Sequence, residues 1–129
     1  MLACETLWLY NNSFKGFLPS EIGKISELAD LDLSQNSLSG SLPSEIGLLT
    51  NMEALDLNSN FFSGKLPTEL GRLTKLTRLA LDDNVFTGTV PDEICQLVEG
   101  GALEMTVDCE IVACSCCKNC AVSQLNHNW

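Results

Sequence analysis

The sequence contains little of what catalysis and nucleic-acid binding require. It has 1 histidine among 129 residues, and 7 basic residues stand against 17 acidic ones, for a formal net charge of -10. A chain this acidic repels phosphate backbones, which excludes nucleic acid as an expected partner. A nucleophile elbow, a phosphate-binding loop and a metalloprotease motif are also missing from the sequence. We therefore expect no enzymatic activity, and no cofactor or metal.

Long apolar runs are missing as well, whereas cysteine is abundant. No segment approaches the roughly 18 consecutive apolar residues of a membrane-spanning helix, and the first residues lack the basic and apolar parts of a signal peptide. The chain has 7 cysteines, most of them between residues 109 and 120. Such density is typical of oxidised, secreted proteins. We therefore expect an extracellular or cell-surface protein whose given chain begins downstream of its signal peptide.

The sequence repeats with a period of 24 residues over most of the chain. Several positions of the repeat, here called registers, hold the same residue type in every copy. The leucine register comprises Leu7, Leu31, Leu55, Leu79 and Leu103. The asparagine, glycine and proline registers comprise Asn12, Asn36, Asn60 and Asn84; Gly16, Gly40, Gly64 and Gly88; and Pro19, Pro43, Pro67 and Pro91. An internal repeat of this length indicates a solenoid.

Each register has a physical role in such a solenoid. In the segment LxxLxLxxN the leucines point inward from a short strand, so that stacked strands form one parallel sheet with an apolar interior. The asparagine amide bonds backbone groups of the adjacent turn. Proline followed by serine or threonine and glutamate suits the start of a short helical turn. We predict an α/β repeat solenoid, a right-handed superhelix with a short parallel β-sheet on its concave side and short helical or 3-10 turns on its convex side.

The repeats resemble those of plant-type leucine-rich-repeat proteins. The second repeat reads LDLSQNSLSGSLP over residues 31–43 and carries the LSGxLP signature of that family. The resemblance covers roughly residues 4–99 and implies an extracellular recognition arc that binds through its concave sheet. We expect four repeats of 24 residues over 1–99, a degenerate fifth strand and cysteine-rich cap over 100–120, and a polar tail over 121–129.

The cysteines near the C-terminus predict a disulfide-bonded cap. Cys95 replaces the glycine found at positions 23, 47 and 71, and we expect it to link the fourth repeat to the cap. The cysteines expected to form three disulfides, in a pairing that stays open, are Cys95, Cys109, Cys114, Cys116, Cys117 and Cys120. A zinc site that uses Cys117-x-x-Cys120 and two further cysteines is the alternative. The pattern Cys-x-Cys-Cys-x-x-Cys also resembles the caps of leucine-rich-repeat proteins from diatoms and related algae.

The residues expected to point outward from the concave sheet form the candidate binding site. They are Trp8, Tyr10, Asp30, Asp32, Asp56, Asn58, Arg78, Asp82, Asp83 and Glu104. Six of them are acidic and one is basic, so we expect a negative face. Exposed aromatic side chains beside acids suit a hot spot for a cationic peptide or a sugar. The alternative is that Trp8 and Tyr10 pack on a neighbouring repeat or subunit.

Two functions follow from this pattern. The first is an extracellular recognition module that binds protein, peptide or carbohydrate on the acidic concave face. The second is a structural subunit of an extracellular or cell-surface assembly or filament, which self-associates through an uncapped N-terminal repeat. An ice- or mineral-binding surface is disfavoured, because the convex side lacks a regular threonine ladder. The sequon Asn11-Asn12-Ser13 marks Asn11 as a glycosylation acceptor of a secreted chain.

Overall fold

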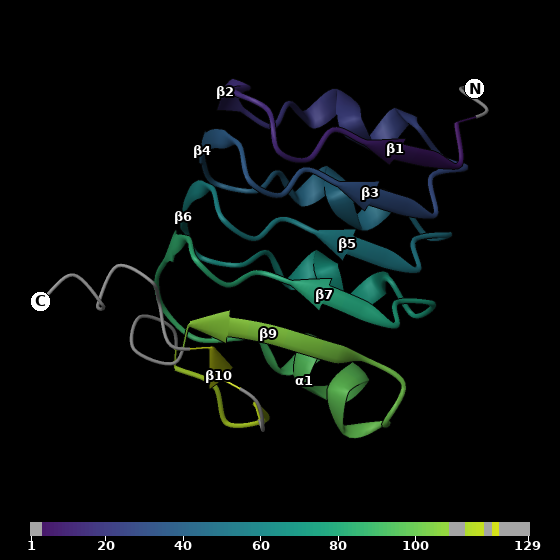
Figure 1. The fold of residues 1–129 in the computed structure, drawn as a ribbon. Coiled ribbons are helices and arrows are strands. Elements are labelled where there is room, and N and C mark those ends of the chain that lie inside the picture. Colours follow the sequence, from purple (N-terminus) through teal and green to yellow (C-terminus); the bar gives the residue numbers. More distant parts are fainter. Residues whose placement is uncertain (1–3, 109–112, 118–119, 122–129) are drawn as a thin grey trace, which may run out of the picture.

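The first sheet forms one wall of the molecule. The computed structural model describes residues 4–108, 113–117 and 120–121, in which repeats and cap contribute strands to a parallel sheet of six (Figure 1). In order across the sheet these are β1 (Thr6–Trp8), β3 (Asp30–Asp32), β5 (Ala54–Asp56), β7 (Arg78–Ala80), β9 (Glu104–Asp108) and β10 (Cys120–Ala121). This wall confirms the expected sheet, and β10 runs one residue past the predicted end of the cap at position 120.

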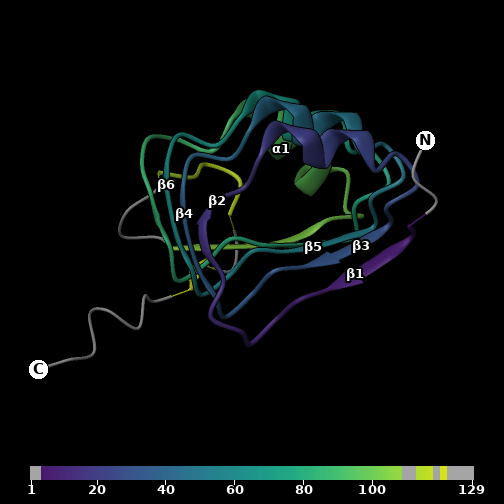
Figure 2. The same cartoon turned by 90° about the horizontal axis from the view of Figure 1, so that it is seen from above.

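A second parallel sheet, which the repeat pattern did not predict, forms the adjacent wall. Its strands are β2 (Lys15–Phe17), β4 (Ser37–Gly40), β6 (Phe61–Gly64) and β8 (Val85–Phe86). Before each strand the chain turns through a residue of positive φ, for example 57° at Gln35 and 61° at Ser59. Figure 2 shows how the two sheets and the helical turns enclose the interior. These strands are too short to show as a periodicity in the sequence.

The third wall consists of short helical turns, which confirms the expectation for the convex side. They are the 3-10 turns η1 (Ser20–Lys24), η2 (Ser44–Leu48) and η3 (Thr68–Arg72), followed by the α-helix α1 (Asp92–Glu99) in the fourth repeat. Each follows a proline, whose fixed φ directs the chain into the turn. Glycine in the 3-10 turns permits close stacking, because a Cβ on Gly47 would lie 2.7 Å from the backbone oxygen of Glu69. Cys95 takes this position in α1.

The repeating leucines form one continuous core. Leu31 and Leu55 have no exposed surface, and they lie in register with Leu79 across β3, β5 and β7. Side chains from the other two walls, such as Phe62 and Ile46, complete the same cluster. Burying one such side chain stabilises the fold by roughly 1.5–3 kcal/mol. Since each repeat buries its leucines partly against its neighbours, the stack is stable only as a unit.

A ladder of buried asparagines pairs the polar backbone groups inside the coil. The side-chain amide of Asn60 donates to the carbonyl of Leu33 at 2.8 Å, and its oxygen accepts from the N–H of Leu38 at 3.0 Å. Asn36 and Asn84 make the equivalent bonds. Both of these groups belong to the preceding repeat, and the amide of Asn60 also donates to the carbonyls of Leu57 and Asn58 in its own turn at 3.3 Å. The ladder therefore fixes the register between repeats as well as the shape of each turn.

We predict that removing a buried rung of this ladder destabilises the fold far more than removing the exposed first rung. Asn60→Ala leaves the buried N–H of Leu38 without this partner, at a cost of about 1–3 kcal/mol, and takes one donor from the Leu33 carbonyl, which keeps the amide of Asn36. Asn12→Ala is the matched control, because Asn12 is exposed and bonds two carbonyls of its own turn. Urea denaturation should show a loss of about 2–4 kcal/mol for Asn60→Ala and under about 1 kcal/mol for Asn12→Ala. Equal losses would contradict the ladder's role.

The ladder ends at Asp108, which stands where a fifth asparagine would. Its carboxylate accepts the backbone N–H groups of Asp83 at 3.0 Å and Asn84 at 3.2 Å. In the inner repeats the corresponding N–H groups donate to a backbone carbonyl of the next repeat, as Ser59 does to Asp82. A carboxylate accepts without donating, so Asp108 closes the ladder. Burial raises the pKa of Asp108, against the lowering effect of the two N–H groups.

We predict a pH dependence of stability that belongs to Asp108. Its pKa in the folded chain lies above its usual value of 3.8, so the folded state binds this proton more tightly than the unfolded state. Its contribution to the free energy of unfolding is therefore fully present below that usual value and is lost as the pH rises through the folded-state pKa. Asp108→Asn removes this contribution. In urea titrations, the difference between wild type and variant should change across this acidic window and stay constant at neutral pH; a difference that never changes with pH would refute the assignment.

Candidate functional site

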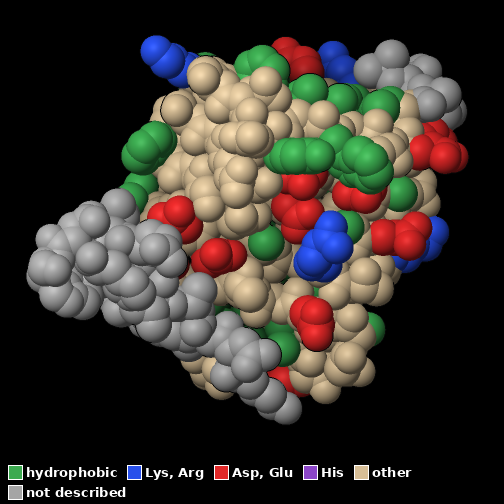
Figure 3. Space-filling model, in the orientation of Figure 1, with side chains coloured by type: hydrophobic (Ala, Val, Ile, Leu, Met, Phe, Trp, Pro, Cys, Tyr) green, Lys and Arg blue, Asp and Glu red, His purple; other side chains and the backbone are tan. Residues whose placement is uncertain are grey.

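The outward side of the first sheet, which we call the concave face, carries the candidate binding residues. The parallel register aligns them in rows across the strands. One row is Trp8, Asp32, Asp56, Ala80 and Thr106, and the other is Thr6, Asp30, Ala54, Arg78 and Glu104. Acidic side chains gather over this sheet around a basic one (Figure 3). Because neighbouring strands lie about 4.8 Å apart, side chains in one row are within reach of one another.

The structure places the ten candidate residues at three depths. Trp8, Tyr10, Arg78 and Glu104 are exposed; Asp30, Asp32, Asn58, Asp82 and Asp83 are half-buried; and Asp56 is buried. The two aromatic side chains on and just after β1 are 61% and 53% exposed, far more than the leucines between and beside them. The face therefore offers a large apolar surface at its N-terminal end and carboxylates beyond it.

Three of the six carboxylates are already bonded within the protein. Oδ1 of Asp32 accepts the N–H of Ser34 at 3.0 Å and its hydroxyl at 2.6 Å. Oδ1 of Asp82 accepts the hydroxyl of Thr106 at 2.7 Å. Asp56 is bonded to an arginine. A count of acidic residues therefore overstates the number of carboxylates that are free to receive a ligand.

The arginine partner of Asp56 is Arg78. Its Nε and Nη2 donate to the two carboxylate oxygens at 2.9 and 2.8 Å, in a two-pronged ion pair. The bond to Asp56 raises the pKa of Arg78, with further contributions from the charges of Asp30 and Asp32. Reasoning from the sequence missed this pair, although the register contained the signal. Arg78 lies beside Ala54, so Asp56 is its diagonal neighbour and within reach of a long side chain.

Asp30 is the carboxylate whose bonding is left incomplete. Its Oδ1 is buried and has no hydrogen-bond partner within the described ranges of the chain. The residue lies on β3 between Thr6 and Ala54 of the adjacent strands. An unpaired buried oxygen is costly unless a donor reaches it. Asp30 is therefore the carboxylate on this face with an unmet hydrogen-bonding requirement in the described chain.

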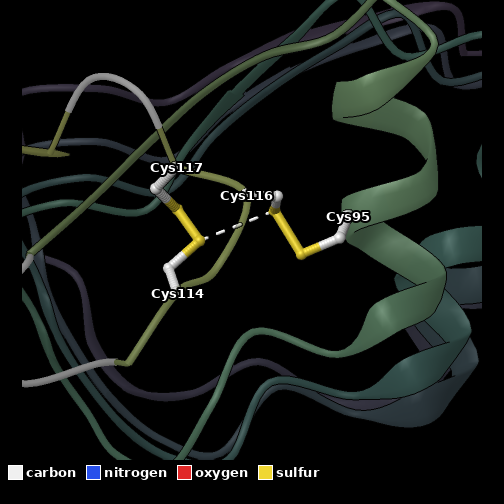
Figure 4. The surroundings of a disulfide bond; sticks show 4 residues. All are labelled: Cys95, Cys114, Cys116 and Cys117. Atoms are coloured by element: carbon white, nitrogen blue, oxygen red, sulfur yellow. Dashed lines mark hydrogen bonds between the residues drawn. A yellow bond between two sulfur atoms is a disulfide. The ribbon is translucent and has the colours of Figure 1, made fainter.

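Within the described residues, two disulfides hold the cap and involve four of the six expected cysteines. Cys95 of α1 bonds Cys116, which confirms the predicted link between fourth repeat and cap, and Cys114 bonds Cys117 (Figure 4). Adjacent Cys116 and Cys117 therefore have different partners. Cys109 lies outside the described residues, as does the side chain of Cys120.

Two further features bear on the surroundings of the protein. Asn11, the expected glycosylation acceptor, lies in an exposed turn after β1, where its N–H donates to the carbonyl of Ser34 at 2.9 Å and its φ is 56°. Among the described residues, no helix has the length and apolar character needed to cross a membrane. Glycan occupancy at Asn11 stays a prediction.

Coil, ladder and outward face together define a repeat solenoid of the leucine-rich type, and comparison with known proteins identifies the family. The family model "Leucine Rich Repeat" matches residues 3–25, 27–49, 51–73 and 75–97. The chain belongs to the leucine-rich-repeat family. No match was found among curated proteins.

Several solved structures are similar to this chain. The ectodomain of the Arabidopsis thaliana receptor kinase GASSHO1/SCHENGEN3, in complex with CASPARIAN STRIP INTEGRITY FACTOR 2, is 42% identical with a TM-score of 0.74, over 81% of this chain and 12% of that one. The Arabidopsis receptor kinase HAESA, in complex with the peptide hormone IDA and the co-receptor SERK1, is 34% identical with a TM-score of 0.72, over 81% and 18%. A plant ice-binding protein is 31% identical with a TM-score of 0.73, over 85% and 34%. This chain thus spans 12% to 34% of their lengths, and the matches indicate no enzymatic family.

Proposed function

We propose that this chain is an extracellular recognition module that binds a short basic peptide, or a basic segment of a protein, on its concave face. The observation that carries the proposal is the exposed pair Trp8 and Tyr10 at the N-terminal end of a face that carries carboxylates, of which Asp30 and Glu104 are not bonded within the described chain. Receptor ectodomains of the same fold and 34–42% identity have been solved in complexes with the factor and the hormone named above. Their ligands support a peptide as the class of partner.

The chemistry of the face supports a ligand that combines an apolar part with a positive group. The ring faces of Trp8 and Tyr10 attract cations and bury apolar side chains. Asp30 and Glu104 provide carboxylates beyond the aromatic pair. Arg78 uses two of its N–H groups to bind Asp56. Because the Arg78 side chain is 56% exposed, its remaining N–H groups are available to a backbone carbonyl of the ligand.

The size of the face supports a short ligand. Six strands at about 4.8 Å spacing extend over about 24 Å. An extended peptide of about seven residues crosses that distance. A standard protein interface uses about 20–30 residues on each side, more than this face offers. A peptide that lies across the strands therefore fits it better than a folded partner.

An extracellular location is part of the same proposal. Two disulfides fasten the cap, and disulfides persist in oxidising compartments. Asn11 lies exposed beside the concave face, where a glycan does not interfere with folding. The similar receptor structures are ectodomains. Carbohydrate is the alternative ligand class, because exposed aromatic side chains beside carboxylates also suit a sugar.

We predict that peptides selected on this protein are enriched in lysine and arginine and depend on the aromatic pair. Selection from a random phage-displayed heptapeptide library on the immobilised chain provides the ligand, and calorimetry provides the dissociation constant. Replacing Trp8 and Tyr10 together by alanine should weaken binding at least about tenfold. Asp30→Asn should weaken it and reduce its salt dependence.

Phe61→Ala is the matched control for the aromatic pair. Phe61 is 57% exposed, like Tyr10, but it lies on β6 of the second sheet. This substitution should leave the dissociation constant unchanged. Selected peptides without basic residues, or equal losses from Phe61→Ala and from the Trp8 and Tyr10 variant, would overturn the proposal.

A second candidate function, self-association as a structural subunit, is favoured by the first repeat. We define the N-terminal edge by Leu7, Leu9, Asn12 and Phe14, whose equivalents Leu31, Leu33, Asn36 and Leu38 are buried in the second repeat, together with Phe17, which lines the same opening. An apolar cavity of about 140 Å³ opens there, lined by Leu9, Phe14, Phe17, Leu18, Pro19, Leu33 and Leu38. The side chain of Asn12, at the first position of the asparagine ladder, likewise has no hydrogen bond to another repeat in the described chain. It bonds its own turn, whereas Asn36 also bonds the repeat before it.

Charge supports a second copy of the chain as the occupant of this edge. The described part of the first repeat, residues 4–24, carries Glu5 and Glu21 against Lys15 and Lys24 and is neutral, whereas the whole chain carries -10. Two copies therefore repel each other least through this edge. The other end does not accept a repeat, because Cys95 replaces the stacking glycine and is bonded to Cys116. Association of edge with edge gives closed dimers and not an open filament.

We predict that Phe17→Asp abolishes such a dimer. Phe17 is 73% exposed on β2, so the change is tolerated in the monomer but places an unpaired carboxylate in an apolar contact. Phe61→Asp introduces the same charge on β6 away from the edge. Sedimentation velocity should show a dimer for wild type and Phe61→Asp, and a monomer for Phe17→Asp. A monomeric wild type at all concentrations would eliminate self-association and leave the recognition function.

Similarity to a plant ice-binding protein does not lead us to propose that activity. Positions at the start of the convex turns hold Ser20, Ser44 and Thr68 in the three 3-10 turns. They do not form a regular threonine ladder. The concave face, with its bonded and half-buried carboxylates, is the surface with the more specific chemistry.

A further inference from the structure

The sulfur atoms of the cap form one cluster. The Sγ atoms of Cys114 and Cys116, which belong to different disulfides, are 3.6 Å apart (Figure 4). The Sγ atoms of Cys95, Cys114 and Cys116 all lie within 4.8 Å of one another. Cys117 adds a fourth sulfur, which is bonded to that of Cys114. Two neighbouring disulfides thus bring three sulfurs within 4.8 Å of one another, with the fourth attached to one of the three.

The cluster has the surroundings of a structural metal site. Cys95 and Cys116 are buried, and Cys114 and Cys117 are half-buried against the core. Cys95 comes from α1 and the other three from a single loop, so the four sulfurs bridge two elements. The potential ligands that converge there in the described part of the chain are all cysteines. A closed, all-sulfur donor set selects zinc and other soft metals over calcium or magnesium.

The spacing of the sulfurs fits tetrahedral coordination. A Zn–S bond is about 2.3 Å, which places the four sulfurs of a tetrahedral site about 3.8 Å from one another. The contact of 3.6 Å between Cys114 and Cys116 is already close to that value. The two bonded pairs must separate by between one and two ångströms after reduction, on the order of a side-chain rotation.

We propose that Cys95, Cys114, Cys116 and Cys117 form a tetrathiolate site for Zn²⁺ when both disulfides are reduced. Two molecules of a dithiol each give two electrons and two protons to one disulfide, which yields four thiols and two oxidised, cyclic disulfides. Zn²⁺ then binds the four sulfurs and displaces four protons. In the reverse direction, two molecules of a disulfide oxidant take up four electrons from the protein and four protons from water to become four thiols, the two protein disulfides form again, and Zn²⁺ leaves.

The consequence is a cap that stays fastened to α1 in either redox state. Under oxidising conditions the Cys95–Cys116 bond joins them, and under reducing conditions the metal does. The site differs from the pattern Cys117-x-x-Cys120, because it uses Cys114, two residues from Cys116, and Cys95 of the helix. It is independent of what the concave face binds, so its failure leaves the proposed function untouched.

The test begins with the full-length wild-type chain reduced by a water-soluble phosphine, which becomes a phosphine oxide as it reduces each disulfide. Titration with Co²⁺ should give one equivalent of binding with the visible absorption and the thiolate charge-transfer bands of tetrahedral sulfur coordination. One equivalent of Zn²⁺ should displace it and raise the Tm of the reduced chain. Alkylation with N-ethylmaleimide, mapped by peptide mass, should show Zn²⁺ protecting Cys95, Cys114, Cys116 and Cys117 while Cys4 reacts.

Variants separate this site from the remaining cysteines. Cys95→Ser and Cys114→Ser should each lose the tetrathiolate spectrum. Cys4→Ser is the matched control, because Cys4 is a free thiol in the described part of the chain. The double variant Cys109→Ser with Cys120→Ser should keep the full spectrum.

Two results would overturn the assignment. Reduced wild type that binds no equivalent of Co²⁺ or Zn²⁺ excludes the site outright. Protection of Cys109 and Cys120 in place of Cys95 and Cys114 moves the metal to the other cysteines. The alkylation map is read on the wild type, so it decides the question even where a serine variant fails to fold.

Discussion

The asparagine ladder is the interaction on which the rest of this structure depends. Each repeat turns sharply between the two sheets, and that turn places backbone N–H and carbonyl groups inside the coil, away from water. Asn36, Asn60 and Asn84 pair these groups with a side chain that both donates and accepts. Because each rung bonds the preceding repeat, the leucines stack in register and the outward residues fall into rows. The concave face is thus a consequence of a constraint inside the coil.

The same ladder explains why the two ends of the stack differ. At the start, Asn12 has the residue type of a rung and, in the described chain, bonds to its own turn alone. At the other end, Asp108 only accepts, and it takes up the N–H groups that a further repeat would have paired. Cys95 adds a steric stop where the inner repeats have glycine. One end therefore retains the chemistry of a repeat interface and the other has replaced it.

The inner repeats were predictable from the sequence because each register answers a local requirement. Leu31 and its equivalents must be buried, and the asparagine must bond the backbone groups of its turn. Neither requirement depends on the sequence outside the repeat. The second sheet was not predictable, since strands such as Val85–Phe86 are held by the neighbouring strand and not by their own pattern. Pairing of Cys114 with Cys117 likewise depends on the path of the cap loop, which no repeat specifies.

The candidate site shows the limit of reading charge from sequence. Six acids against one arginine predicted a negative face, but Asp32 is bonded to Ser34, and Asp56 forms a two-pronged ion pair with Arg78. These bonds fix the two carboxylates in place and reduce the number of carboxylates that are free to bind a ligand. Asp30 alone combines a position in the row with a buried oxygen that lacks a partner in the described chain. The proposed function then requires a ligand whose apolar part covers the aromatic pair and whose donors reach the carboxylates that are not already bonded. A polycation without an apolar part meets only half of that requirement, so net charge by itself is a poor guide to what binds.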